Sequence, residues 1–520
     1  MRNRITYCLI LTVAVNWLLV FPAFSQTMDV AWGVQIGTSG EEMFTDVASD
    51  RAGNSYVVGR TDGDLVGASQ GQKDGFIAKY NSEGGLQWQD QFGTSGTEEV
   101  TGVTVDHDLN VYVFGQTNNT IGDQRFGRVD VFIRKYNSQG DVQWTKQYGT
   151  SGGDYPSRIT VDENSNCYAI GKTTGDWATE SEGSYDAFLL KLDSEGKQIW
   201  VSQFGSSGSD EGRDVTFNSE GDVFVVGQTN GDLAGVNEGN QDGFFAKLND
   251  QGEVQWIQQF GSSQQDQASG IALDNAGNIY IGGWTGGVLG DRQYGNGDAY
   301  LALFDSEGEK LWIRQFGTGN WDGSHGLTGT LDGSGDVVLS GCWTWPSCHG
   351  WMRRYNSEGE LVWEKLIYNR ASSSSCGQTV AIDPSGACYH VGLTEDNLFA
   401  TSAGGQDGFL VKVSSTSGIR QSGESNVPTS FRLSQNYPNP FNPTTEIQYE
   451  TDQPSQITIN ILNMNGQRIR TLADDIHHSG SYSVTWDARN DAGQPVSSGM
   501  YFCELRTEKG VQKIKMVLMR

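Results

Sequence analysis

Apolar and polar residues alternate along most of the chain in short runs that recur at a fixed interval. In one unit, apolar runs at 101–105, 111–115, 131–136 and 142–148 are rich in Val, Tyr, Phe and Ile, and Asp, Asn, Gly and Ser separate them. Runs of this length, bounded by turn residues, predict β-strands rather than helices. We therefore expect each unit to form a four-stranded antiparallel sheet.

A tryptophan marks the fourth run of every unit. The seven residues are Trp32, Trp88, Trp144, Trp200, Trp256, Trp312 and Trp363. Their numbers rise in steps of 56 up to residue 312, and the last step is 51. A four-stranded unit with such a period predicts a β-propeller, in which a single blade cannot bury its faces without its neighbours. We expect the repeated Trp to be the buried anchor of each blade.

The two ends of the repeat array complement each other. The last unit has predicted strands at 379–383, 388–392 and 409–413 but lacks the fourth, whereas residues 29–37 match the fourth-strand pattern. Pairing of 29–37 with 409–413 would complete the last blade and remove both exposed sheet edges. The sequence thus predicts an all-β fold, a seven-bladed β-propeller closed by an N-terminal strand.

The repeat also has a recognisable consensus. It reads Trp…Phe-Gly-Thr-Ser-Gly…Val-Asp…Gly-Asn-x-Tyr-Val-x-Gly…Asp-Gly-Phe-x-x-Lys. With this pattern, residues 29–413 resemble the seven-bladed beta-propeller repeat family called SBBP. The resemblance implies the fold and says little about chemistry, because the family is defined by its blade.

The N-terminal segment predicts export. Residues 1–25 place Arg2 and Arg4 before an apolar run and end in small residues, which is typical of a cleaved signal peptide. The propeller would then span 26–413, and the polar stretch 414–428 indicates a linker. No later stretch of 18 apolar residues predicts a transmembrane anchor.

Residues 429–520 predict a small immunoglobulin-like β-sandwich, because their runs alternate between apolar and polar residues. The module opens with Asn436, Tyr437, Pro438, Asn439, Pro440, Phe441, Asn442 and Pro443. With Trp486-Asp487 and the closing residues 515–520, this segment is similar to the type A C-terminal sorting domain of the bacterial type IX secretion system. The resemblance implies recognition by the type IX secretion machinery, and a secreted or cell-surface protein exported through the periplasm.

Charge and motif context exclude several functions. The chain has 35 Lys and Arg against 63 Asp and Glu, a net charge of −28, which disfavours nucleic acid and anionic membranes as partners. Residues 149–153 match the G-x-S-x-G motif of hydrolases, but no strand leads into a helix there. Because Gly-Thr-Ser-Gly recurs at 37–40 and 93–96, we interpret it as a turn between blades.

Binding residues are expected on one face of the ring. The connections between second and third strands and those between blades share a face, here called the loop face, and loops on a rigid scaffold often carry binding residues. Four tryptophans outside the repeat pattern predict a platform there for a glycan or a surface protein: Trp177, Trp284, Trp343 and Trp345. Six loop acids would suit calcium, with turn formation as the alternative: Asp62, Asp64, Asp123, Asp176, Asp232 and Asp291.

A second set of acids opens the third strand of the blades. Its members are Asp74, Asp130, Asp186, Asp242, Asp298 and Asp407. A reaction centre is asymmetric, whereas these carboxylates repeat around the ring. We therefore expect them to accept hydrogen bonds that fix the start of each strand.

Six cysteines remain once the signal peptide is removed. They are Cys167, Cys342, Cys348, Cys376, Cys388 and Cys503, and an exported protein permits disulfides between them. The sequence leaves the full connectivity open. The short spacing of Cys342 and Cys348 favours a disulfide within their loop over a metal site completed by His349.

Together these features favour a non-catalytic binding or adhesion module, with no catalytic residue assigned. The alternative is an extracellular enzyme, either carbohydrate-active or similar to the quinoproteins. Residues 193–200 resemble the Trp-docking segments of quinoproteins, although the Asp-to-Trp spacing is one residue short. A structural stalk is disfavoured, because a closed ring does not extend.

Overall fold

The computed structural model describes residues 28–329, 334–344, 348–367, 375–415, 432–433, 436, 441–451, 455–464, 467–477, 480–507 and 510–518. Residues 1–25, most of the linker, Trp345 and residues 437–440 lie outside this set, so what the sequence predicts of them stays a prediction. All named elements in the described part are β-strands. The chain divides into two compact units, Met1–Ser415 and Thr416–Arg520.

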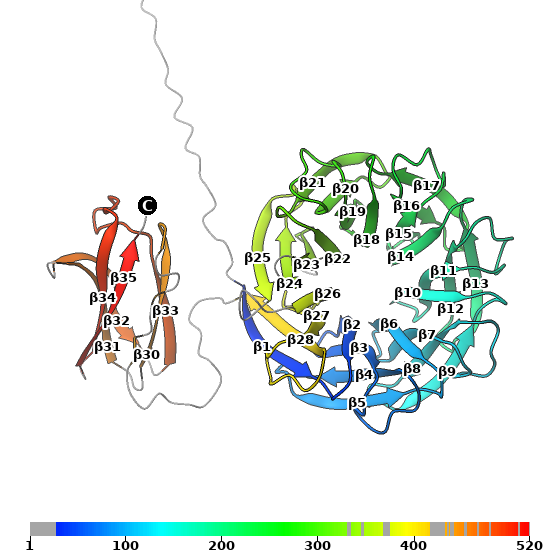
Figure 1. Cartoon of the computed structure of the whole chain (residues 1–520), viewed down its shortest axis with the longest axis horizontal. Coiled ribbons are helices and arrows are strands. Elements are labelled where there is room, and N and C mark those ends of the chain that lie inside the picture. Colours follow the sequence, from blue (N-terminus) through cyan, green and yellow to red (C-terminus); the bar gives the residue numbers. More distant parts are fainter. Residues whose placement is uncertain are drawn as a thin grey trace, which may run out of the picture. The chain divides into compact units, whose positions relative to one another are not determined.

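The first unit is a propeller of seven four-stranded antiparallel blades (Figure 1). Blades 1 to 3 comprise β2 (Glu42–Ser49), β3 (Ser55–Thr61), β4 (Asp74–Tyr80) and β5 (Leu86–Phe92); β6 (Glu98–Val105), β7 (Val111–Thr117), β8 (Asp130–Tyr136) and β9 (Val142–Tyr148); and β10 (Asp154–Val161), β11 (Cys167–Thr173), β12 (Asp186–Leu192) and β13 (Gln198–Phe204). Blades 4 to 6 comprise β14 (Asp210–Phe217), β15 (Val223–Thr229), β16 (Asp242–Leu248) and β17 (Val254–Phe260); β18 (Asp266–Leu273), β19 (Ile279–Thr285), β20 (Asp298–Phe304) and β21 (Lys310–Phe316); and β22 (Asp322–Gly329), β23 (Val337–Thr344), β24 (Cys348–Tyr355) and β25 (Leu361–Ile367).

Blade 7 joins the two ends of the propeller. It contains β26 (Ser375–Ile382), β27 (Cys388–Thr394), β28 (Asp407–Ser415) and, on the outside, β1 (Met28–Ile36). β1 pairs antiparallel with β28, from Met28 opposite Ser415 to Ile36 opposite Gly408, and Figure 1 shows the blue and yellow strands side by side. The predicted closure by an N-terminal strand is confirmed.

Apolar clusters between neighbouring blades hold the ring together. One such cluster combines Val58 and Ile77 of blade 1 with Val103, Val113 and Phe132 of blade 2. The second and third strands of the blades are buried on both faces, as in β7 and β8. This double burial explains why their sequences are almost continuously apolar instead of strictly alternating.

The repeated tryptophans lie further out than predicted. Trp363 is buried at 5% exposure, but the other six are half-buried on the outermost strands. The Nε1 of Trp88 donates to the Ser138 carbonyl of the next blade at 3.2 Å. Gly140 in the same turn has a φ of +90°, and a Cβ there would stand 2.6 Å from the Trp88 ring. These tryptophans therefore link one blade to the next, and the turn beneath them requires glycine.

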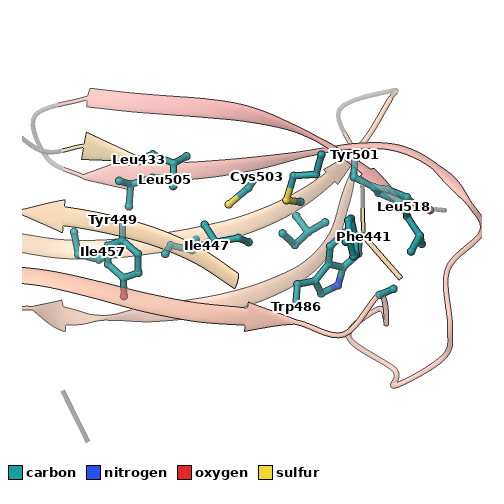
Figure 2. Close-up of a cluster of buried hydrophobic side chains, with 14 residues drawn as sticks. Leu433, Phe441, Ile447, Tyr449, Ile457, Trp486, Tyr501, Cys503, Leu505 and Leu518 are labelled. Carbon is teal, nitrogen blue, oxygen red and sulfur yellow. The ribbon is translucent and has the colours of Figure 1, made fainter. Parts of the chain in front are cut away.

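The second unit is a β-sandwich of two sheets. One sheet has β29 (Arg432–Leu433), β30 (Thr445–Thr451) and β33 (Gly480–Trp486); the other has β32 (Arg468–His477), β31 (Ser455–Asn463), β34 (Gly499–Thr507) and β35 (Gly510–Leu518). Figure 2 shows Phe441 and Tyr501 beside Trp486, with ring centroids 5.5 and 5.0 Å from that of the tryptophan. Asn436 is buried and donates to Thr445 Oγ1 at 2.8 Å. The start and the end of the predicted opening motif therefore pack onto the sandwich.

Candidate functional site

Every innermost strand of the propeller has a bulge at the same place. The pairing with the second strand shifts across one residue in each of the seven blades. The seven bulge residues are Thr45, Thr101, Ser157, Arg213, Ser269, His325 and Gln378. A bulge redirects a side chain relative to the sheet. All seven line one cavity of about 240 Å³.

This cavity lies in the central channel, near the loop face. One bulge residue from each of the seven blades lines it, so it sits on the axis about which the blades are arranged. Each bulge residue comes three positions after the first residue of its strand, as Thr45 follows Glu42. The innermost strands begin where the connections between blades end, and these connections belong to the loop face. The lining therefore comes mostly from the first half of these strands, the half nearer the face on which the sequence predicts binding.

A buried ion triplet occupies the strand position that follows the bulge. The guanidinium of Arg158 pairs with Asp46, and its Nε lies 3.7 Å from Asp214 Oδ1. Asp46 Oδ2 also accepts the Val103 N–H at 2.9 Å, and Asp214 Oδ2 accepts the Ile271 N–H at 3.0 Å. Burial raises the pKa of Asp214 to about 6, although Arg158 acts in the opposite direction. The triplet links blade 3 to blades 1 and 4, and its Arg158 lines the cavity.

Polar side chains continue from the cavity toward the loop face. Glu211 Oε2 lies 3.3 Å from Lys172 Nζ and 3.4 Å from an Arg213 nitrogen, and it accepts the amide of Gln228 at 2.9 Å. Arg213 Nε is buried and has no hydrogen-bond partner. Glu211 is thus shared by three donors, which leaves Arg213 with unused hydrogen-bonding capacity at the cavity.

Aromatic side chains border the cavity at blades 5 and 6. Trp284 Nε1 donates to Gln267 Oε1 at 2.6 Å, and its ring centroid is 5.7 Å from that of Trp321. The Trp321 ring centroid lies 6.2 Å from that of His325, which lines the cavity. Both tryptophans are half-buried. An aromatic pair therefore stands next to a polar cavity.

His325 also contacts a cluster of three sulfur atoms. Its Nε2 lies 3.5 Å from Cys342 Sγ, and the Sγ atoms of Cys342, Cys348 and Cys376 lie within 4.8 Å of one another. The predicted disulfide within the loop is wrong, because Cys348 pairs with Cys376 across the boundary between blades 6 and 7. Burial lowers the pKa of His325 to about 4 and raises the pKa of the Cys342 thiol to about 12. Both groups are therefore neutral at pH 7.

Replacing Cys348 by serine is expected to move the disulfide instead of abolishing it. Cys376 then loses its partner, and the Cys342 thiol lies within 4.8 Å of it. In air-oxidised protein we expect peptide mapping by mass spectrometry to find a Cys342–Cys376 link. The matched variant Cys388→Ser removes a buried cysteine that forms no disulfide, and it should keep the Cys348–Cys376 bond. An alkylatable Cys376 in the Cys348→Ser protein would contradict the expected rearrangement.

The four predicted binding tryptophans do not form a common platform in the described structure. The Trp177 ring lies 4.8 Å from Phe188 and packs on an apolar cluster, and Trp343 packs on the core of blade 6 under Arg353. Trp345 lies outside the described residues. Of the three that the structure describes, Trp284 is the one found beside the cavity, and its aromatic partner is Trp321.

The six predicted calcium ligands are not brought together either. Among the described residues, the one group of three or more His, Cys, Asp or Glu side chains placed to share a metal is the sulfur cluster. Asp64 accepts the Ser69 N–H at 2.8 Å, and Asp176 accepts the Ser181 N–H at 2.9 Å. Asp62 and Asp232 likewise accept loop N–H groups. These contacts support the alternative, in which the acids shape turns.

The second acid set accepts hydrogen bonds within its blades, as expected. Asp186 Oδ2 accepts the amide of Gln203, on the fourth strand, at 2.8 Å. In blade 7 the corresponding donor is Gln35 of β1, 2.7 Å from Asp407. A further ring of carboxylates, overlooked in the sequence, starts the innermost strands: Glu42, Glu98, Asp154, Asp210, Asp266 and Asp322. Asp154, for example, accepts the Thr150 N–H of the preceding turn at 2.7 Å.

The bulge ring was also missed, although the sequence holds a signal for it. Its residues keep the 56-residue step from Thr45 to His325, and all seven are polar. At this position of the repeat the residue is always polar but varies between Thr, Ser, Arg, His and Gln. This pattern would have indicated the channel lining.

Family models agree with this architecture. The beta-propeller repeat, SBBP, matches residues 31–65, 143–176, 199–234 and 255–290. The chain contains SBBP repeats. The FlgD Ig-like domain matches residues 438–510, within the second unit. In the described residues, no helix has the length and apolar character needed to cross a membrane.

Two curated proteins are similar to parts of the chain. Regulatory protein FlaEY of Caulobacter vibrioides is 27% identical over 282 residues, which cover 45% of this chain and 29% of that protein. An uncharacterized WD repeat-containing protein of Acanthamoeba polyphaga mimivirus is 25% identical over 199 residues, 31% of this chain and 14% of that protein. The chain thus spans less than a third of the length of either relative.

Solved structures share the architecture at low identity. PorZ, a bacterial surface component of the type IX secretion system of Porphyromonas gingivalis, is 12% identical with a TM-score of 0.40, over 91% of this chain and 59% of that one. A polysaccharide lyase of family PL25, an ulvan lyase, is 12% identical with a TM-score of 0.45, over 73% and 96%. Likeness at this level concerns the fold alone.

Proposed function

We propose that this chain is an exported, non-catalytic binding module whose ligand docks on the loop face, around the mouth of the central channel. The supporting observation is where the repeat loses its symmetry. At the channel mouth, equivalent positions of different blades carry unlike side chains, such as Lys172, Gln228 and Trp284. Elsewhere the blades repeat the same structural contacts. Variable side chains at one place on an otherwise uniform scaffold are typical of a binding site.

The chemistry of the site favours binding over catalysis. The carboxylates that open the third strands and the innermost strands accept hydrogen bonds from their own blades and turns. Burial holds His325 and Cys342 in their neutral forms at pH 7, and Glu211 is shared by three donors. A general base needs an accessible group with a pKa near the working pH, and the pKa values of His325, about 4, and of Cys342, about 12, lie far from it.

A glycan is the ligand class that the site suits best. Sugars present both hydroxyl groups and apolar ring faces, and the channel mouth offers polar groups next to the Trp284–Trp321 pair. Aromatic rings beside a few oriented polar groups are typical of selective small-ligand sites. A surface protein is the other outcome that the test can return.

The test is a binding screen of the purified full chain against a glycan array and a panel of surface proteins. We expect a glycan to bind, and Trp284→Ala or Trp321→Ala to weaken its binding at least tenfold. Gln139→Ala changes an exposed turn on the opposite face and serves as the control. Binding that survives both tryptophan variants would contradict this location, and the absence of any ligand would contradict the function.

We also propose that residues 429–520 direct export through the type IX secretion machinery. Support comes from the similarity of Asn436–Pro443 and of the closing residues 515–520 to type A sorting domains. In a host with that system, removal of 429–520 should leave the propeller in the periplasm. The propeller's strands all lie before residue 416, so the shortened chain should keep its melting temperature. Unchanged appearance of the shortened chain at the cell surface would contradict this route.

A further inference from the structure

The channel cavity has the composition of a specific polar site. Its wall combines hydroxyl, amide, imidazole, guanidinium and carboxylate groups, and every blade contributes at least one residue. Thr101 Oγ1 and Arg213 Nε are both buried without a hydrogen-bond partner. Burying such groups unpaired is unfavourable. A ligand that offers several hydroxyl groups would satisfy donors and acceptors from several blades at once.

The charged side chains that line the cavity are paired with opposite charges. Three cationic side chains stand against three carboxylates: Arg158, Arg213 and Lys172 against Asp46, Asp214 and Glu211. Burial keeps His325 neutral at pH 7. An anionic ligand would compete with these pairs and approach Glu211, a carboxylate in the cavity lining. The site therefore favours a neutral ligand.

Size and rim define the ligand further. A cavity of about 240 Å³ has room for one hexose ring. Trp321, half-buried next to His325, can cover one apolar face of a ring that enters the channel. A glycan would then insert its terminal unit while the rest of the chain stays on the loop face.

From this geometry we propose that the central channel binds a single neutral sugar unit, the terminal residue of a glycan. Thr101, Ser269 and Gln378 hydrogen-bond to its hydroxyl groups, Arg213 donates to one of its oxygens, and Trp321 contacts an apolar ring face. The inference rests on the proposed function and deepens it, because it names the ligand class and the residues that select it.

The test titrates the full chain with the methyl glycosides of glucose, galactose and mannose, by calorimetry and saturation-transfer NMR. We expect at least one to bind, Thr101→Val and Ser269→Ala each to weaken binding about tenfold, and Trp321→Ala to weaken it tenfold or more. Thr104→Val, in the same strand but outside the cavity lining, should bind as wild type. Because Thr101 Oγ1 has no partner in the protein, Thr101→Val should keep the melting temperature.

Three results would overturn the assignment: no neutral glycoside binds, Thr101→Val and Ser269→Ala bind as wild type, or methyl glucuronide or inorganic phosphate binds more tightly than every neutral glycoside. A glycan whose affinity falls in Trp284→Ala but not in Thr101→Val or Ser269→Ala would overturn the channel site and leave the loop-face function standing. Failure of every glycan and protein ligand would overturn both.

Discussion

Replacing Arg158 by leucine is expected to lower the free energy of unfolding by about 3–5 kcal/mol at pH 7, because it leaves two buried carboxylates without their cation. The side chains of Asp46 and Asp214 are 3% and 12% exposed. Both also accept backbone N–H groups from the next blade, so they cannot turn toward solvent without breaking contacts between blades. Urea unfolding followed by tryptophan fluorescence measures the loss.

The loss should shrink in acid. The pKa of Asp214 in the folded protein is about 6, above its unfolded value of 3.8, so this group lowers stability above pH 6 and the penalty is relieved as the pH falls. Without Arg158 the folded pKa rises further, and the variant should recover about 1–2 kcal/mol relative to wild type between pH 7 and pH 5. His325 and His390, whose folded pKa values are lowered to about 4, destabilise both proteins together in this range.

A triple variant separates lost charge from lost packing. Asp46→Asn and Asp214→Asn combined with Arg158→Leu remove all three charges and keep the shapes of the acids. This protein should regain most of the stability that the single variant loses, since replacing a buried ion group as a whole is often neutral. A triple variant as unstable as Arg158→Leu, or a loss that is constant from pH 7 to pH 5, would assign the effect to packing.

The repeat period made the fold predictable, because a propeller blade is a local unit. Each strand needs its own apolar run and turn residues, and these recur with Trp88, Trp144 and their equivalents. Even the closure was predictable, since β1 carries a fourth-strand pattern without a blade of its own. The solvent exposure of the tryptophans was not predictable. The pattern does not tell whether a side chain packs within its own blade or over the next blade.

The candidate site depends on contacts that no repeat pattern contains. Trp284 and Trp321 meet near the channel because blades 5 and 6 lie side by side there, and Arg158 reaches Asp46 across a whole intervening blade. The disulfide shows the same limit. Cys348 is closer in sequence to Cys342, yet the boundary between blades 6 and 7 brings Cys376 to it. The chemistry at the centre of the ring depends on which residues of different blades come close together. The sequence alone does not give these distances.

Deleting residues 28–36 is expected to prevent stable folding of the propeller, with a loss above about 5 kcal/mol, comparable to the whole stability of many domains. β28 would become an exposed, apolar sheet edge, which favours aggregation. The deletion also removes Met28 and Val30 from the apolar cluster shared with blade 6, and Val34 and Ile36 from the cluster shared with blade 1. Circular dichroism and light scattering of the purified protein measure the outcome.

Two point variants compare the same hydrogen-bonded glutamine in two places: within a continuous blade and at the closure of the ring. Gln35 and Gln203 occupy the same place in the repeat, and each donates to a blade aspartate and accepts N–H groups of the adjacent loop. Gln203→Leu breaks these bonds inside a continuous blade, whereas Gln35→Leu breaks them where the two chain ends meet. Each should cost about 2–3 kcal/mol locally, and Gln35→Leu should in addition increase exchange of the β28 amides with solvent. If the variant that lacks residues 28–36 melts within a few degrees of wild type, packing between blades is sufficient to hold the ring together. The N-terminal strand would then extend the last blade without being required for ring closure.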